Sequence, residues 1–217
     1  MSDYILSCSS SADLSDEWFN KRGIVYVCFH FNLGGIDYPD DMGKTVSSDE
    51  LFRRMNDGED TKTSQITVSE YTEHFEKYLK EGKDVIHVCL STGITGTYNS
   101  ACVARDTLAE EYPDRKIYVI DSLSASSGFG LLVELMADKR DEGMNIDELY
   151  NWTEKNKKKL IHWFFSSDLT FFIRGGRISK TSGTIGNILN ICPLMNVDST
   201  GHLIVREKVR TKKKVIK

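Results

Sequence analysis

The sequence predicts an α/β protein, with a mostly parallel β-sheet in the N-terminal part and a smaller α+β part after it. Three short apolar runs rich in β-branched residues, at 4–8, 85–90 and 117–120, are typical of buried parallel strands. Helical patterns follow these runs, and strands that alternate with helices favour a parallel sheet. After about residue 160 the pattern changes to short strands and tight turns, which indicates the second part.

The first third of the chain alternates strands with polar turns. We expect the first strand to end in a serine-rich turn, followed by a helix capped near Asp13. A second strand is predicted over 24–31, and the residues at 32–36 favour a hairpin into a short return strand. Ser47 or Ser48 is expected to cap a short helix.

Two helices begin with the signature of a capping box, in which the first residue and the fourth bind each other's backbone N–H. Thr67 and Glu70 form the first of these motifs, directly after a polar extended stretch at 63–67. Asn145 and Glu148 form the second. Both helices are therefore predicted to start at these positions.

The stretch 85–108 is predicted to be a strand, a loop of glycines and threonines, and a helix. Such junctions hold anionic ligands in α/β proteins, because backbone N–H groups and the partial positive charge of the helix face the loop. The hydroxyls of Thr92, Thr95 and Thr97 add donors, and no Walker motif is present. The pattern predicts a carboxylate or phosphate cradle without catalytic groups, or else a tight turn whose threonines only cap the helix.

Serine and threonine fill the loops after three of the predicted strands. The carboxyl ends of parallel strands meet at one edge of a sheet, so we expect these loops to lie together there. Three hydroxyl-rich loops at one edge favour a ligand site.

We divide the chain into an α/β domain at 1–158 and an α+β domain at 159–217. The elements expected in the second are a strand (161–165), an amphipathic turn (168–172), a basic loop (174–177), a small helix (184–189), a strand (193–197), a hairpin turn (198–201) and a strand (203–209). The chain stops in a basic run that resembles the start of a helix, so we expect a longer natural protein.

Composition excludes several classes of protein. The net charge of −4 gives no reason to expect a nucleic-acid partner. No targeting signal and no apolar run of membrane-spanning length is evident, so we expect a cytoplasmic protein. The five cysteines and five histidines lack the spacing of disulfide frameworks or metal sites, so we predict free thiols, no metal and no cofactor.

Several segments together resemble the DegV family of bacterial fatty-acid-binding proteins. They occur in the family's order, span nearly the whole chain and are specific as a set. They are S-S-A-D-L at 10–14, T-S-Q at 63–65, the loop and helix start at 90–101, D-S at 121–122, R-G-G-R-I-S at 174–179, I-G-N-I-L-N-I-C-P-L at 185–194, the turn at 198–201 and R-T-K-K at 210–213.

The resemblance implies two domains with a fatty acid in an apolar tunnel between them. In the family, the threonine of T-S-Q and the hydroxyl residue of the S-G-T loop hold the carboxylate, and these positions are Thr63 and Thr95 here. The family usually has serine at the second position. Ser64, Gly96 and Arg177 are further candidates for ligand binding, and Arg177 is equally well explained as a surface or interdomain arginine paired with a carboxylate.

Two departures from the family pattern bear on the site. The family's first loop usually carries Thr-Asp where this chain has Cys8-Ser9, and the family's C-terminal segment rich in histidine and glycine has no match. The sequence also does not decide which residues line the implied tunnel, since four phenylalanines fit either the tunnel wall or the core. They are Phe29, Phe31, Phe129 and Phe171.

The resemblance further implies a non-catalytic carrier that presents a long-chain fatty acid to a fatty acid kinase catalytic protein, with transient membrane-surface contact. Most of the binding free energy is expected from the acyl chain, at about 0.8 kcal/mol per buried CH₂. One alternative is a hydrolase or transferase with a Ser or Thr nucleophile, which requires an adjacent base. His87, inside a strand, is expected to pack against a neighbour instead. The other alternative is a binder of another small organic acid.

Overall fold

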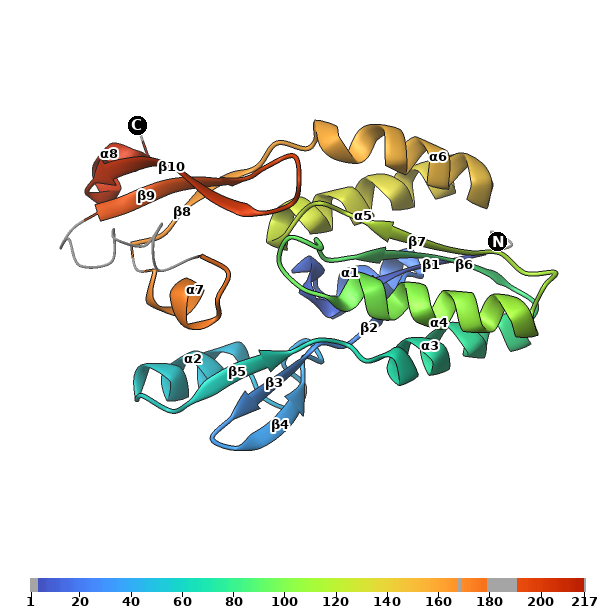
Figure 1. The fold of residues 1–217 in the computed structure, drawn as a ribbon, viewed down its shortest axis with the longest axis horizontal. Helices are drawn as coiled ribbons and strands as arrows, with labels where there is room; N and C mark the ends of the chain where they lie inside the picture. The colour runs from blue at the N-terminus through green and yellow to red at the C-terminus, as the bar shows by residue number, and fades with distance from the viewer. Residues whose placement is uncertain (1–3, 168, 179–190, 217) are drawn as a thin grey trace.

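The computed structural model describes residues 4–167, 169–178 and 191–216. A four-stranded parallel sheet forms its centre (Figure 1), in the order β2-β1-β6-β7. Its strands are β1 (Tyr4–Ser9), β2 (Val25–Val27), β6 (Asp84–Cys89) and β7 (Ile117–Asp121). The two central strands, β1 and β6, are buried along nearly their whole length. This architecture confirms the predicted α/β class.

Helices cover both faces of the parallel sheet. One face packs against α1 (Asp16–Arg22), α5 (Ser126–Asp141) and α6 (Ile146–Asn156), and the other packs against α3 (Val68–Lys80) and α4 (Thr97–Glu111). Leu6, Ile86 and Phe129 are fully buried on the first face, and Phe75 and Val85 on the second. Each large side chain buried in this way contributes about 1.5–3 kcal/mol. No helix among the described residues is long and apolar enough to cross a membrane.

Helix starts follow the predicted signatures with one exception. Both capping boxes form as predicted at the starts of α3 and α6. The cap predicted near Asp13 was wrong, because the turn η1 (Ser10–Ala12) leaves Asp13 in the left-handed conformation, at φ 53°. The chain enters α1 only after Ser15, whose hydroxyl accepts a hydrogen bond from the Trp18 N–H at 3.1 Å.

A second, antiparallel sheet interrupts the N-terminal part, in the order β4-β3-β5. It consists of β3 (His30–Leu33), β4 (Ile36–Pro39) and β5 (Thr61–Ser64), and α2 (Ser48–Asn56), capped by Ser47, lies beside it in Figure 1. The single strand predicted over 24–31 was therefore wrong. Its parallel pairing with β1 ends at the Ser9–Val27 pair, since β1 turns into η1 there, and the chain then joins the second sheet.

The third sheet is antiparallel and C-terminal, in the order β10-β9-β8. It contains β8 (Trp163–Phe165), β9 (Ile191–Val197) and β10 (Leu203–Arg210), with α7 (Thr170–Arg174) after β8 and α8 (Lys212–Val215) after β10. The turn η2 (Lys157–Lys159) connects it to α6. The hairpin turn predicted at 198–201 is confirmed, whereas the helix predicted at 184–189 lies outside the described residues.

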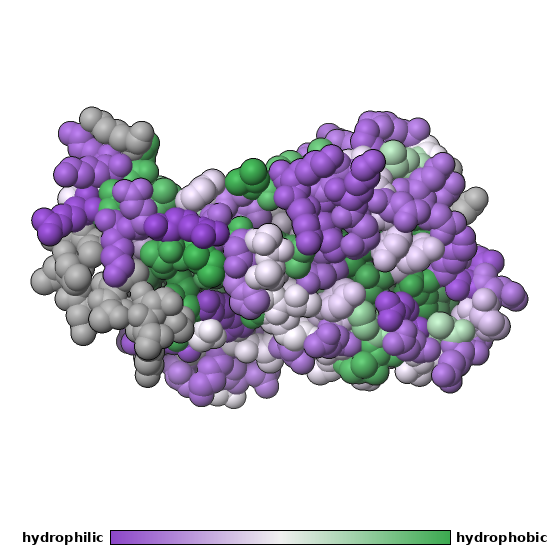
Figure 2. Space-filling view, turned by 45° about the horizontal axis from the view of Figure 1, so that its top comes forward, coloured by the Kyte–Doolittle hydropathy of each residue, from purple (hydrophilic) through white to green (hydrophobic). Residues whose placement is uncertain are grey.

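Packing in this sheet is sparse. Only Leu169, Ile178 and Met195 form its buried cluster among the described residues. Figure 2 shows hydrophobic side chains at the surface of this end of the molecule, among hydrophilic ones. Trp163 is 52% exposed and Phe171 is 42% exposed. The domain boundary after residue 158 stays a prediction.

Candidate functional site

The loops that follow β6 and β7 lie together at the carboxyl edge of the parallel sheet. The Ser91 N–H donates to the Ser124 carbonyl at 3.2 Å, and the Ser122 N–H donates to the Cys89 carbonyl at 3.1 Å. The loop after β1 is nearby along the same edge, because β1 pairs with β6 in parallel register. The predicted gathering of hydroxyl-rich loops is therefore present.

The three predicted threonines of the β6–α4 loop differ in the hydrogen bonds that their hydroxyls make to described residues. The Thr92 hydroxyl donates to Asp121 Oδ2 at 2.6 Å, and the buried Thr97 hydroxyl bonds the Tyr71 hydroxyl at 2.9 Å. The half-buried Thr95 hydroxyl has no hydrogen-bond partner among the described residues. Thr92 and Thr97 thus hold the protein together, and Thr95 remains as a donor.

The start of α4 adds backbone donors beside Thr95. Gly96 is the N-cap residue and provides no side-chain cap. The first N–H groups of a helix have no intrahelical acceptor, and the aligned peptide dipoles place a partial positive charge there. A negatively charged group next to Thr95 is therefore stabilised by the helix as well.

Thr63, at the end of β5, lies beside a cation. Arg177 Nη2 donates to the Thr63 hydroxyl oxygen at 3.1 Å, and Arg177 Nη1 donates to the Gly175 carbonyl at 2.7 Å. No carboxylate pairs with Arg177 in the described part of the chain. The guanidinium is therefore held against the Thr63 hydroxyl, and no carboxylate of the described residues neutralises its charge.

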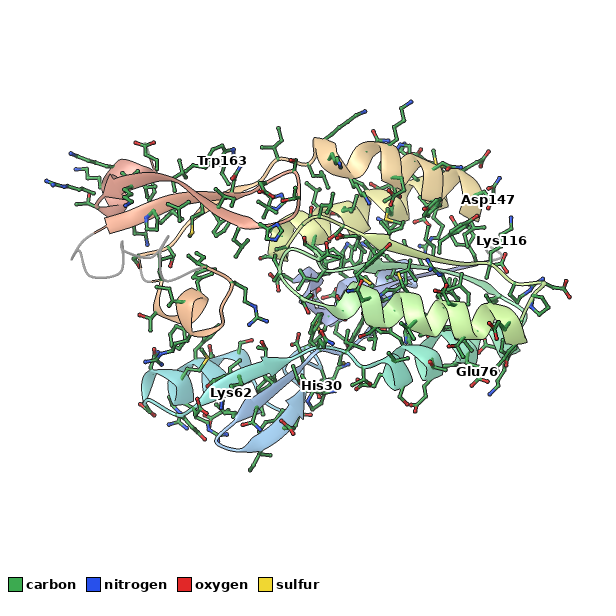
Figure 3. All side chains as sticks on the ribbon, in the orientation of Figure 1. His30, Lys62, Glu76, Lys116, Asp147 and Trp163 are labelled. Atoms are coloured by element: carbon green, nitrogen blue, oxygen red, sulfur yellow. The ribbon has the colours of Figure 1, made fainter. Side chains whose placement is uncertain are left out.

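An aromatic surface flanks Thr63. Thr63 is paired with Phe31 across the antiparallel ladder, and cross-strand partners point to the same face of a sheet. Phe31 is 8% exposed and stacks on Tyr38 with ring centroids 5.7 Å apart. Ser64 points to the other face, because successive residues of a strand alternate. Figure 3 shows this small sheet with His30 and Lys62 labelled.

The two candidate segments meet at Gln65 and Gly96. A Cβ on Gly96 would lie 2.7 Å from Gln65 Oε1, closer than real Cβ contacts allow. The end of β5, with Thr63, and the β6–α4 loop, with Thr95, are thus neighbours. Gln65 stands within the T-S-Q segment but is not among the predicted site residues. Its position against Gly96 joins segments far apart in the sequence, so no local pattern indicates it.

Two of the four phenylalanines belong to the cores of the parallel sheet. Phe129 is fully buried in the core beneath α5, and Phe29 packs against the core on the α3 and α4 side. Phe31 and Phe171 belong to neither of these two cores. They remain as candidates for the wall of a ligand site.

No described histidine lies within hydrogen-bond distance of the Thr63 or Thr95 hydroxyl. His30 pairs with Glu70 at 3.1 Å, and His202 Nδ1 bonds the Thr200 hydroxyl at 2.9 Å. A nucleophilic threonine requires such a base. The described residues also contain no group of three His, Cys, Asp or Glu side chains arranged to hold a metal ion.

Two further histidines form a buried network around Ser7. Its hydroxyl bonds His74 Nε2 at 2.7 Å and His87 Nδ1 at 2.9 Å. Burial, with the Lys77 charge as a smaller contribution, lowers the pKa of His74 to about 4, and burial also lowers the pKa of His87. Both rings are neutral at pH 7. His87 packs against its neighbours as predicted, and this network ties α3 to β1 and β6.

The described residues thus place the Thr95 hydroxyl beside the start of α4, at the carboxyl edge of the parallel sheet, and Arg177 against Thr63. The sequence model of the DegV family, described as a family of uncharacterised proteins, matches residues 8–217. The chain therefore belongs to the DegV family.

Relatives and solved structures agree with this assignment. A DegV domain-containing protein of Clostridium perfringens is 35% identical over 217 residues, which is 100% of this chain and 75% of that protein. A DegV lipid binding protein from Thermotoga maritima has a TM-score of 0.84 at 28% identity, over 100% of this chain and 74% of that one. The Streptococcus pneumoniae Fatty Acid Kinase B3 protein loaded with linoleic acid has a TM-score of 0.84 at 27% identity, over 99% of this chain and 75% of that one.

Proposed function

We propose that this protein binds a long-chain fatty acid and holds its carboxylate between Thr63, Thr95 and Arg177. The contact of Arg177 with Thr63 carries the proposal, because it sets a cation and a hydroxyl beside the segment that meets the Thr95 loop. The named solved relatives support the same ligand class, since one is a lipid binding protein and one holds linoleic acid.

The binding free energy divides between head group and chain. Each hydrogen bond to a carboxylate contributes about 1.5–3 kcal/mol. The acyl chain adds about 0.8 kcal/mol per buried CH₂, before the cost of association is deducted. Phe31 and Phe171 are the described aromatic side chains that we assign to the start of the apolar wall.

We further propose that the protein is a carrier without catalysis of its own, which presents the carboxylate to a fatty acid kinase for phosphorylation. The absence of a histidine base on either threonine, within the described residues, supports holding rather than turnover. The structural similarity to the Streptococcus pneumoniae Fatty Acid Kinase B3 protein supports a fatty acid kinase as the partner. Incubation with a fatty acid kinase catalytic protein and ATP, with detection of acyl phosphate, tests this step.

The first experiment is mass spectrometry of the small molecules released when the purified protein is denatured. We expect about one long-chain fatty acid per protein, and a sample that takes up no fatty acid when supplied with it would exclude the proposal.

Matched variants test the site itself. Thr63→Val and Thr95→Val keep the side-chain shape and remove the hydroxyl, so each should weaken fatty acid binding at least tenfold. Thr107→Val is the control, because the exposed Thr107 hydroxyl donates to the Val103 carbonyl within α4 at 3.1 Å, about three turns along the helix from Gly96. Equal affinities for all four proteins would contradict the assigned residues.

A further inference from the structure

The turn between β9 and β10 lies against the loop that carries Thr95. The buried Ser91 hydroxyl donates to the Gly201 carbonyl at 2.8 Å, which joins residues 110 positions apart. Figure 1 shows the β9–β10 hairpin reaching from the C-terminal sheet to the end of the parallel sheet, near the start of α5. The C-terminal part of the chain thus contacts the candidate site at this turn as well as through Arg177, which follows α7.

The contact is made at backbone distance and tolerates no extra atoms. A Cβ on Gly93 would lie 2.4 Å from the Gly201 carbonyl oxygen. A Cβ on Gly201, whose φ is +81°, would lie 1.9 Å from Ser91 Oγ. Glycine is therefore needed on both sides, at Gly201 for its backbone conformation as well.

The hairpin turn is held in shape by its own aspartate. Asp198 Oδ1 accepts hydrogen bonds from the Thr200 N–H at 2.8 Å and the His202 N–H at 3.0 Å, and the Gly201 N–H donates to the Asp198 carbonyl at 3.0 Å. The Thr200 hydroxyl and these N–H groups lower the pKa of Asp198. The Gly201 carbonyl is therefore presented to Ser91 by a preformed turn.

Ser91 also determines where Thr95 lies. Its carbonyl accepts the Ile94 N–H at 3.0 Å and the Thr95 N–H at 3.2 Å, and its hydroxyl oxygen accepts the Gly93 N–H at 3.1 Å. One serine thus holds the backbone of the loop up to Thr95, and its hydroxyl proton anchors that loop to the hairpin.

We propose that Ser91 is a positioning residue for carboxylate binding, through which the β9–β10 turn fixes the Thr95 hydroxyl and the start of α4. This inference rests on the proposed function, and it assigns to the C-terminal hairpin a role in the head-group site. Removal of the Ser91 hydroxyl should loosen the loop without removing any group that touches the ligand.

The test measures the affinity of the full chain for saturated fatty acids of about 10 to 16 carbons, by competition with a fluorescent fatty acid. The logarithm of the affinity rises linearly with chain length, because each added CH₂ contributes the same binding free energy. Ser91→Ala should weaken every acid by the same factor, about tenfold, and leave the slope unchanged. A change of slope would overturn the proposal, since it indicates a general packing defect that alters the apolar wall as well. Affinities equal to those of the unmodified protein would also overturn it.

Ser122→Ala is the matched control. Ser122 is equally buried, its hydroxyl accepts the Ser124 N–H at 3.1 Å, and it donates to the Ser124 carbonyl. Among the described residues its hydroxyl makes no hydrogen bond to the hairpin. It should lower the melting temperature about as much as Ser91→Ala and leave the affinities as they are. A parallel loss of affinity in Ser122→Ala would overturn the role of the hairpin.

Gly201→Ala is the second variant, and it should give a parallel loss at least as large because the added methyl displaces the turn. Unaltered affinity in a folded Gly201→Ala protein would overturn the inference independently of Ser91. Failure of the unmodified protein to bind any acid would instead reject the proposed function itself, and this inference with it.

Discussion

The parallel sheet and the C-terminal sheet are stabilised by different means. Helices on both sides enclose the parallel sheet, and its two cores contain fully buried side chains such as Leu6, Ile86, Phe75 and Phe129. The C-terminal sheet has a small cluster around Met195 and leaves Trp163 half exposed. Among the described residues, the Gly201 carbonyl of its β9–β10 turn accepts a hydrogen bond from Ser91, and Arg177, between α7 and β9, donates to Thr63.

This difference separates stability from ligand binding. Apolar burial scales with area and gives the parallel sheet most of the free energy of folding. The described contacts of the C-terminal part with the site are directional hydrogen bonds, which add little stability and fix positions instead. The ion pair of Lys116 with Asp147 lies at the end of the parallel sheet that points away from the site, and it belongs to the part of the molecule that provides stability (Figure 3).

The largest expected effect comes from the core of the parallel sheet. Phe129→Ala should lower the free energy of unfolding by about 3–5 kcal/mol, because it empties a fully buried site beneath α5. Phe164→Ala, in the sparse C-terminal cluster, should cost roughly 1–2 kcal/mol. Urea denaturation measures both, and equal losses would contradict the comparison of the two regions.

Acid should weaken the parallel sheet through His74. The folded protein keeps this ring neutral down to pH about 4, whereas the unfolded chain takes up a proton below about pH 6.5. Stability is therefore full above pH 6.5 and is lost as the pH falls towards 4, by at most about 3 kcal/mol. His87 acts in the same direction, since burial also lowers its pKa.

His74→Gln isolates this contribution. Glutamine retains a hydrogen-bonding group for Ser7 and does not titrate. The difference in unfolding free energy between the unmodified protein and the variant, measured at pH 7.5, 6, 5 and 4, should shrink towards acid. Parallel curves over that interval would show that His74 is not the titrating group.

Arg177 should affect binding without affecting stability. Arg177→Gln removes the charge beside Thr63 and should weaken fatty acid binding about tenfold, because a charge-assisted contact is lost. The melting temperature should stay within about 1 °C, since the side chain is exposed. Arg174→Gln is the control, because Arg174 stacks on Phe171 and does not bond Thr63. A similar loss of affinity in both variants would point to net charge rather than to a specific contact.

The smallest expected effect concerns the cap of α3, the helix that follows the Thr63 strand. Thr67→Ala breaks the capping box with Glu70 and should cost about 1 kcal/mol. Ser69→Ala, exposed on the first turn of the same helix, should change stability by less than about 0.5 kcal/mol. Thermal denaturation at pH 7.5 separates the two, and equal stabilities would mean that tertiary packing alone defines the start of α3.

Local patterns in the sequence determined much of this fold. Apolar runs with β-branched residues predicted β1, β6 and β7, and the capping boxes at Thr67 and Asn145 predicted the starts of α3 and α6. Such signals succeed because the groups involved lie within a few residues of one another. The serine and threonine loops were expected at one sheet edge for a similar reason, since parallel strands all end there.

Tertiary structure decided what depends on partners distant in the chain. The strand predicted over 24–31 splits between two sheets because its partner β1 ends at Ser9. Of the three loop threonines, Thr92 bonds Asp121 and Thr97 bonds Tyr71, whereas the Thr95 hydroxyl has no hydrogen-bond partner among the residues that the structure describes. The approach of Gln65 to Gly96 and the bond from Ser91 to Gly201 likewise join remote segments. A hydrogen bond between residues far apart in sequence leaves no local pattern, so these contacts had to be read from the folded chain.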